Sequence, residues 1–259
     1  MTELSRQKKQ RYARQIILKE VGEKGQRKLE ASTVLLVGAG GLGSPIALYL
    51  AASGVGHLIV ADGDVVALSN LGRQVIHTTA RIGQAKVESA ADTLQALNPE
   101  IRLTKVSEWL DGDNLDGWVS KADLVLDGSD NFETRYRVNA ACHQGGKPLV
   151  FGAVLGFEGQ VGVIRSGLVP GTPCYRCLFP KMPSRSEGMP TCSTAGVIGP
   201  LTGVIGSLQA TEAIKVLLGV GDPPDGSLLL VNVLDNLYRR IRFPAKPDCP
   251  VCGEETIDG

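Results

Sequence analysis

The segment 33–44 constrains the fold of this chain more than any other, because an apolar run leads directly into a glycine-rich turn. It consists of Thr-Val-Leu-Leu-Val-Gly-Ala-Gly-Gly-Leu-Gly-Ser, which contains the spacing Gly-x-Gly-x-x-Gly. Between a strand and a helix, such glycines let the backbone approach a phosphate, and the helix offers unpaired N–H groups and the positive end of its dipole. The segment therefore predicts a nucleotide-phosphate site, and its glycines are Gly38, Gly40, Gly41 and Gly43.

An acidic residue closes the next apolar run. Asp62 ends the run 57–62, about 20 residues beyond the glycine turn. In this architecture an acidic side chain at that place holds ribose hydroxyls. Taken alone, the two features are typical of an NAD site, but a single fingerprint of this kind does not identify the chemistry, so the rest of the chain has to.

Short β-rich runs alternate with amphipathic segments over the first part of the chain. We expect strands at 33–37, 57–61, 101–106, 123–127 and 148–151, and helices at about 44–53, 83–97 and 131–143. This alternation predicts an α/β fold with a Rossmann-like, doubly wound and mostly parallel sheet. After residue 152 we expect an antiparallel extension with strands at 160–165 and 228–233 and a buried helix between them.

Four of the six cysteines form two C-x-x-C pairs about 70 residues apart, each expected inside a loop: Cys174, Cys177, Cys249 and Cys252. In a reducing compartment such pairs are metal ligands or redox pairs before they are structural disulfides. Two thiolates at i and i+3 fit adjacent corners of a tetrahedron, so two pairs complete a four-coordinate structural Zn²⁺ site. The alternatives are a redox role for one pair or four free thiols.

With 259 residues, we expect a single domain in three parts. These are one or two N-terminal helices at 6–30 outside the main sheet, a nucleotide-binding core at 31–152, and an antiparallel extension with the zinc-bound C-terminal part at 153–259. The last part includes an uncharged stretch, 188–211, that is long enough for a membrane span. Its prolines, glycines and polar side chains favour a buried helix instead.

The charge balance and the N-terminus restrict the partners and the compartment. Lys+Arg and Asp+Glu both total 27, so no global field attracts nucleic acid or an anionic membrane. The N-terminal segment is polar and lacks the apolar stretch of a signal peptide. We therefore expect a cytoplasmic protein that binds its partners locally.

Two cations follow the second expected strand: Arg73 in Ser-Asn-Leu-Gly-Arg-Gln, and Lys86 in Gly-Gln-Ala-Lys. A reaction that accumulates negative charge on a phosphoryl or nucleotidyl group needs cations already placed around it. A dehydrogenase has no such need. By spacing alone, the alternative that both are ordinary surface charges carries equal weight.

Two carboxylates lie where the fourth expected strand ends, in Asp127-Gly-Ser-Asp130-Asn131. Open α/β sheets bind ligands at the carboxyl ends of their strands, so Asp130 is a candidate ligand for Mg²⁺. The alternative is that these side chains only cap the next helix, with Asp130 or Asn131 as N-cap. We favour the structural role for Asp127 and the metal for Asp130.

A single cysteine, Cys192, precedes the long apolar helix. A helix dipole favours the thiolate near the N-terminus, which makes nucleophilic chemistry plausible there. Cys142, within an alanine-rich helical segment, is expected to fill the core.

Together these motifs resemble one family closely, the ubiquitin-activating-enzyme-like adenylyltransferases of bacteria known as the MoeB/ThiF family. The resemblance covers nearly the whole chain. It rests on both cysteine pairs and on the segments 11–15, 38–43, 69–74, 83–86, 127–131 and 195–210.

The resemblance implies roles for particular residues. The catalytic set would be Arg14, which reaches across a homodimer interface into the partner's site, with Arg73, Lys86, Asp130 and Cys192. The nucleotide-binding set would be Gly38, Gly40, Gly41, Gly43, Asp62, Asn70, Arg73, Gln74, Lys86, Asp130 and Asn131.

The resemblance also implies a reaction. ATP with Mg²⁺ would adenylate the C-terminal glycine carboxylate of a ubiquitin-fold sulfur carrier ending in Gly-Gly, which then becomes a thiocarboxylate for molybdopterin or thiamine biosynthesis. No rhodanese domain follows the second cysteine pair, so we expect sulfur from a separate donor, a cysteine desulfurase or a rhodanese.

Two other functions remain as alternatives. One is a tRNA-modifying or non-sulfur relative of the same fold. The other is an NAD-dependent oxidoreductase, which is disfavoured because no catalytic His or Tyr-Lys set is evident and the three histidines are expected to be ordinary surface or strand-end residues.

Overall fold

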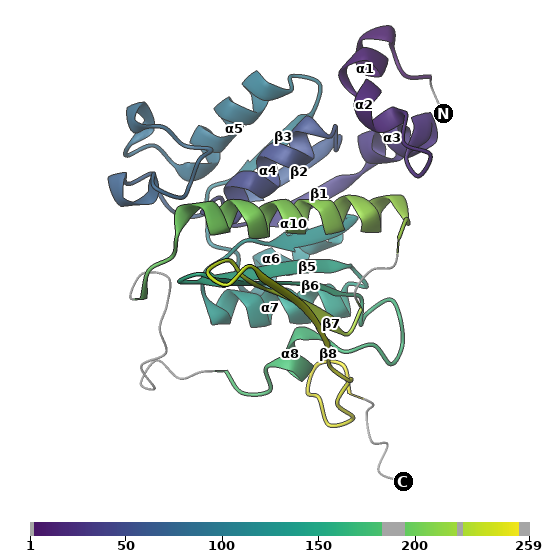
Figure 1. Ribbon diagram of the computed structural model, residues 1–259, viewed down its shortest axis with the longest axis vertical. Coiled ribbons are helices and arrows are strands. Elements are labelled where there is room, and N and C mark those ends of the chain that lie inside the picture. Colours follow the sequence, from purple (N-terminus) through teal and green to yellow (C-terminus); the bar gives the residue numbers. More distant parts are fainter. Residues whose placement is uncertain (1–2, 183–194, 222–224, 254–259) are drawn as a thin grey trace.

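The computed structural model describes residues 3–182, 195–221 and 225–253. Within these ranges, one eight-stranded sheet runs through the molecule in the order β3-β2-β1-β4-β5-β6-β7-β8 (Figure 1). The strands are β1 (Thr33–Val37), β2 (His57–Ala61), β3 (Arg102–Val106), β4 (Leu124–Asp127), β5 (Leu149–Leu155), β6 (Glu158–Ile164), β7 (Ser227–Asn232) and β8 (Leu237–Arg242).

The first five strands are parallel and the last three are antiparallel. The order 3-2-1-4-5 of the parallel part is that of a doubly wound nucleotide-binding fold. Strands β1 and β4 are apolar and almost entirely buried, as expected of central parallel strands that are covered on both faces. The predicted fold class, including the antiparallel extension, is confirmed.

Helices cover both faces of the sheet. One face carries α3 (Gly22–Ala31), α4 (Gly43–Ala52), α5 (Lys86–Leu97) and α10 (Gly199–Leu218), and the other carries α6 (Gly112–Ser120), α7 (Phe132–Gln144) and α8 (Tyr175–Leu178). Each face has its own cluster of buried apolar side chains. Cys142 belongs to the second cluster and is 1% exposed, as expected of a core residue.

The long apolar helix α10 packs along the sheet between α4 and strands β5 and β6. By length and composition it could cross a membrane. Its buried face includes Leu201, Ile205 and Leu217, which lie in the same cluster as the residues of β1 and α4. This packing is that of a core helix, as the sequence predicted for this region.

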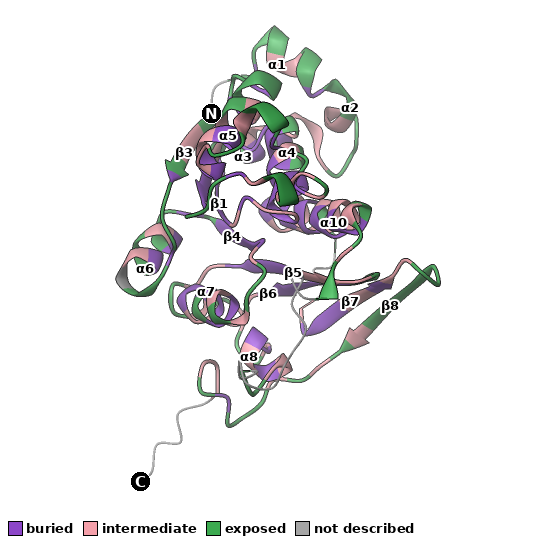
Figure 2. Cartoon of the chain, turned by 90° about the vertical axis from the view of Figure 1, so that its left-hand side faces the viewer, coloured by how far each residue is buried: buried purple, intermediate pink, exposed green. Residues whose placement is uncertain are grey.

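The structure differs from the expected elements in the N-terminal segment, at α6, at β8 and at the first cysteine pair. The N-terminal segment forms three short helices, α1 (Arg6–Arg11), α2 (Ala13–Ile16) and α3, where one or two were expected. Helix α6 and strand β8 were not predicted, and Cys177 lies in the short helix α8 although both cysteine pairs were expected in loops. Strand β8 is an exposed edge with the sequence Leu-Tyr-Arg-Arg-Ile-Arg, which lacks a regular alternation of apolar and polar residues (Figure 2).

Candidate functional site

The glycine turn closes tightly between β1 and α4. Gly38 has φ of 92°, a conformation that side chains rarely adopt. A Cβ on Gly43 would lie 2.0 Å from the carbonyl oxygen of Gly38, so only glycine fits at the start of α4. The turn therefore has the close backbone packing that its spacing predicted.

Two buried side chains hold the Ala39 peptide units of this turn. Asp62 Oδ2 accepts the Ala39 N–H at 2.8 Å, and Nε2 of His77 lies 2.9 Å from the Ala39 carbonyl oxygen. The Nδ1 atom of His77 lies 2.8 Å from Oγ of Ser89 on α5. His77 thus joins the glycine turn to the helix that begins with Lys86.

A pocket opens at the carboxyl ends of β1, β2 and β4, where the strand order reverses. In doubly wound sheets, ligands bind at this switch point. The structure brings nine residues of the expected nucleotide-binding set to the pocket: Gly38, Gly40, Gly41, Asp62, Arg73, Gln74, Lys86, Asp130 and Asn131.

The two expected cations line the same pocket. Lys86 is only 5% exposed, and its Nζ lies 2.9 Å from Asp64 Oδ2 and 4.0 Å from Asp62 Oδ2. Arg73 is half-buried, and its Nη1 donates to the Ser69 carbonyl oxygen at 3.2 Å. Both side chains line one pocket, whereas two ordinary surface charges would not be expected to lie together.

The two carboxylates at the end of β4, Asp127 and Asp130, have different surroundings. Asp127 is buried, its Oδ1 accepts the Ser129 N–H at 2.8 Å, and burial raises the pKa of its carboxyl group despite the nearby Arg135. Asn131 is the N-cap of α7, where its Oδ1 accepts the Thr134 N–H at 2.9 Å. Asp130 is exposed and lines the pocket, so its carboxylate is open to a ligand.

Some expected site residues lie elsewhere. Gly43 and Asn70 do not appear among the described residues that line the pocket, and Asn70 instead accepts the Ala67 N–H through Oδ1 at 3.1 Å. Arg14 is exposed on α2 and is likewise outside this lining. Cys192 lies outside the described residues.

Sequence reasoning missed several residues of the pocket region, among them His77 and Trp109. His77 was expected to be an ordinary surface or strand-end residue, but it is 5% exposed and makes the two contacts described above. Trp109 lines the pocket beyond β3 and is 58% exposed. Neither lies in a recognisable motif, and only the sheet order shows that the end of β3 lies beside the end of β2.

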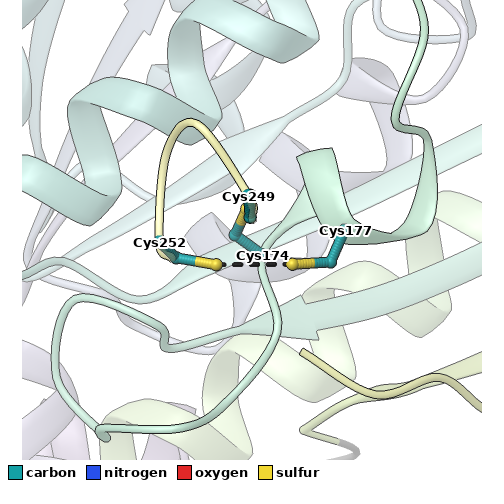
Figure 3. Close-up of side chains that lie close together, drawn as sticks. All are labelled: Cys174, Cys177, Cys249 and Cys252. Carbon is teal, nitrogen blue, oxygen red and sulfur yellow. Dashed lines mark hydrogen bonds between the residues drawn. The ribbon is translucent and has the colours of Figure 1, made fainter. Parts of the chain in front are cut away.

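The four paired cysteines form a second site, where Cys174 and Cys177 at α8 lie beside Cys249 and Cys252 of the segment after β8 (Figure 3). Their sulfur atoms lie within 4.8 Å of one another, with 3.6 Å between Cys174 and Cys249 and 3.4 Å between Cys177 and Cys252. A tetrahedral zinc with bonds of about 2.3 Å places its sulfur atoms about 3.8 Å apart. The predicted grouping of the two C-x-x-C pairs is confirmed, and its geometry fits a four-thiolate metal site.

The chemistry of these thiols also fits a cation. Burial raises the pKa of the Cys174 thiol to about 11. Packing four sulfur atoms together without disulfide bonds leaves mutually repelling thiolates or buried protons. A divalent cation replaces those protons and offsets the repulsion.

Comparisons with known proteins place the chain in a family. A family model described as the ThiF family matches residues 12–251. The chain belongs to the ThiF family. Its relatives include adenylyltransferases that match almost the whole chain, and the chain is itself an adenylyltransferase.

The most informative relatives match this ThiF-family chain almost end to end. A sulfur carrier protein adenylyltransferase of Thermus thermophilus is 49% identical over 95% of this chain and 91% of its own length. A SAMP-activating enzyme E1 of Haloferax volcanii is 48% identical over 96% of this chain and 90% of its own. A molybdopterin-synthase adenylyltransferase of Escherichia coli is 46% identical over 98% and 100%.

Solved structures support the fold of this ThiF-family chain. A crystal structure of Escherichia coli MccB with MccA-N7isoASN superimposes with a TM-score of 0.81, at 22% identity, over 97% of this chain and 76% of that one. A structure of MccB with ATP gives a TM-score of 0.79 at 23% identity, over 94% and 73%. At this identity the likeness concerns the fold.

Proposed function

We propose that this protein uses ATP and Mg²⁺ to adenylate the C-terminal glycine carboxylate of a ubiquitin-like sulfur-carrier protein ending in Gly-Gly. The carrier would then receive sulfur for molybdopterin or thiamine biosynthesis. One observation carries the proposal: a single pocket joins the glycine turn, Arg73, Lys86 and the exposed carboxylate of Asp130. Relatives named as a sulfur carrier protein adenylyltransferase and a molybdopterin-synthase adenylyltransferase, about half identical over nearly the whole chain, support the same substrate class.

The reaction requires the protein to position the two reactants and to supply positive charge. The attacking carboxylate is already ionised at neutral pH, so no general base is needed. The site must align that anion with the α-phosphorus and offset the repulsion between anions. Lys86, held by Asp64, and Arg73, held by Ser69, are cations fixed before the nucleotide arrives.

The metal would be held at the turn after β4. Asp130 offers an oxygen ligand of the kind Mg²⁺ prefers, and the adjacent N-cap Asn131 fixes the turn on α7. Bound there, Mg²⁺ supplies positive charge to the phosphate oxygens. The glycine turn supplies backbone N–H groups at the start of α4, and Asp62 remains available to the ribose.

Arg14 acts, in this proposal, on the site of a second copy. It lies on the exposed helix α2, and two apolar side chains that follow this helix, Ile17 and Leu18, are 73% and 51% exposed. A homodimer that covers these side chains would let Arg14 reach the partner's pocket.

The carrier would approach over the turns at one end of the antiparallel strands. Val154 and Val197 line the pocket, and Gly156 pairs with Val197 beyond it. The apolar side chains exposed at the same end of the sheet are Phe157, Ile198, Leu234, Leu237 and Tyr238. A flexible Gly-Gly tail from a carrier docked on this surface would lead into the pocket.

Sulfur transfer would follow adenylation. A separate donor, a cysteine desulfurase or a rhodanese, would supply a persulfide either directly to the acyl-adenylate or through Cys192. The terminal sulfur of the persulfide would attack the acyl carbon, and AMP would leave. A second thiol would then attack the inner sulfur of the acyl disulfide, which releases the thiocarboxylate and forms a disulfide. The four-cysteine zinc site would anchor the C-terminal segment and leave the chemistry to the pocket.

Exchange of labelled pyrophosphate into ATP tests the proposed reaction. The full chain with ATP, Mg²⁺ and a Gly-Gly-ending carrier should catalyse exchange, and deletion of the carrier's last glycine should abolish it. Lys86→Met should abolish exchange, whereas Lys105→Met, at an exposed lysine paired with Glu88, should not. Failure of exchange with every carrier of the host would overturn the proposal.

Mixing two inactive variants tests the role of Arg14. If Arg14 acts across the dimer, Arg14→Ala and Lys86→Met copies should regain activity when mixed, because one site of each mixed dimer has both residues intact. Activity that stays absent in the mixture would place Arg14 in its own subunit's site or outside catalysis. An Arg14→Ala protein with full activity would show that adenylation does not need Arg14.

A further inference from the structure

The side chain of Trp109 lies at one edge of the nucleotide pocket. It follows β3, and it lines the pocket together with Asp62, Asp64 and Leu110. At 58% exposure it is an unusually open tryptophan for a residue that lines a concave site. An aromatic face that is open beside a nucleotide site offers a surface on which a base can stack.

The backbone of Gly63, just after β2, covers one face of the indole. A Cβ on Gly63 would lie 2.7, 2.8 and 2.8 Å from Nε1, Cδ1 and Cε2 of Trp109. These three atoms belong to the five-membered ring, and their near-equal distances mean that the ring faces Gly63. The absence of a side chain at residue 63, next to Asp62, is what lets the ring lie there.

The position of Trp109 is fixed through its backbone. Asn114 Nδ2 donates to the Trp109 carbonyl oxygen at 3.1 Å, and Asn114 Oδ1 accepts the Asp111 N–H at 2.8 Å. Leu110, the next residue, is 6% exposed and anchors the segment in the core. The indole is therefore presented on a fixed segment, with one face against Gly63 and the other open.

We propose that the open face of Trp109 stacks on the purine base of the bound nucleotide. This inference rests on the proposed function, because it assumes that ATP occupies the pocket. The glycine turn fixes the phosphate end, and Asp62 at the end of β2 fixes the ribose. The base, bonded to the ribose, then extends past Asp62 toward the end of β3, which is where Trp109 lies.

Fluorescence tests the contact directly. The chain has two tryptophans, Trp109 and Trp118, and Trp118 packs on α6 with Lys121 Nζ 4.0 Å from its ring centroid. Titration of the full-length protein with ATP and Mg²⁺ should quench the emission. The quench should persist in Trp118→Phe and be lost in Trp109→Phe; a quench that persists in Trp109→Phe would overturn the proposal.

Calorimetric titration with two ligands tests the energetic role. Trp109→Ala should weaken ATP binding about tenfold, which is about 1.4 kcal/mol and within the range measured for a stacked base. Trp109→Phe, which keeps an aromatic face, should restore most of the affinity. Inorganic tripolyphosphate, which has no base, should bind the wild type and Trp109→Ala equally.

The outcomes separate this inference from the proposed function. If ATP does not bind the wild-type protein, the adenylyltransferase site itself is misassigned. If ATP binds and Trp109→Ala keeps the wild-type affinity, only the stacking is refuted. Equal losses of ATP and tripolyphosphate affinity would also refute stacking, because they would mean that the substitution disturbs the pocket as a whole.

Discussion

His77 should stabilise the glycine turn through one hydrogen bond that a single substitution can remove. The Ala39 carbonyl can only accept, so Nε2 of His77 carries the proton, and Nδ1 is left to accept from the Ser89 hydroxyl. An asparagine at 77 reaches only as far as Nδ1, whereas a glutamine reaches the position of Nε2. His77→Asn therefore leaves the buried Ala39 oxygen without its donor, and His77→Gln retains one.

The cost follows from the burial of both partners. A buried carbonyl that loses its partner costs about 1–3 kcal/mol, whereas a replaced neutral hydrogen bond changes stability little. We expect urea unfolding to show His77→Asn destabilised by about 1–3 kcal/mol and His77→Gln by less than about 1 kcal/mol. Equal destabilisation of the two variants would refute the assignment, because the Ala39 contact would then not distinguish them.

The protonation of His77 adds a pH signature. Burial lowers the pKa of this imidazole, and Lys86 and Arg81 lower it further against the opposing effects of the Ala39 carbonyl and Asp62. The unfolded chain then takes up a proton at higher pH than the folded one, so stability is complete above about pH 6.5 and falls below it, by at most about 1.4 kcal/mol per pH unit. His77→Gln should lack this part of the slope, while His57, whose pKa burial also lowers, remains in both proteins as the internal control. Parallel curves between about pH 7 and pH 5 would contradict the buried neutral imidazole.

Three further perturbations test the site and its supports. Gly43→Ala should abolish ATP binding in calorimetry, because its methyl group would meet the Gly38 oxygen, whereas Gly203→Ala on α10, with open space around it, should bind ATP normally. The purified protein should contain one zinc by elemental analysis, and Cys252→Ala should lose the metal and unfold at a lower temperature; a metal-free wild type that melts normally would contradict the site. Leu237→Glu should raise the KM for the carrier without changing the KM for ATP. The control Leu168→Glu, at a leucine of similar exposure, should change neither KM.

The sequence was sufficient to predict those parts of the site whose residues lie close together along the chain. The glycine turn, the residues at the ends of β2 and β4, and the paired cysteines are encoded by short spacings, and the fold brings each set together. Helix α6 was not predicted because it contains two glycines and few strong helix formers in the sequence Gly-Asp-Asn-Leu-Asp-Gly-Trp-Val-Ser. Its helix depends on the cap at Asp111 and on packing against α7, neither of which periodicity reveals.

His77 and Trp109 show a different limit. Each owes its place to a contact made between elements far apart in the chain: Ala39 and Ser89 for His77, and Gly63 for Trp109. A histidine without a carboxylate or cysteine nearby in sequence, or a tryptophan in a polar loop, has no spacing that distinguishes it from an ordinary surface residue. Arg14 is a third case, since the role expected of it depends on a second chain.

Asp62 shows why a motif residue can have two functions at once. Both of its oxygens already accept backbone N–H groups, Oδ2 from Ala39 and Oδ1 from Asp64, each at 2.8 Å. A carboxylate has about four acceptor positions, so these bonds leave room for a ribose hydroxyl. The same side chain can therefore hold the glycine turn, face Lys86 and still contact the nucleotide. Because Asp62 holds the glycine turn whether or not a nucleotide is bound, its presence does not identify the reaction, and the proposed function depends instead on Arg73, Lys86 and Asp130.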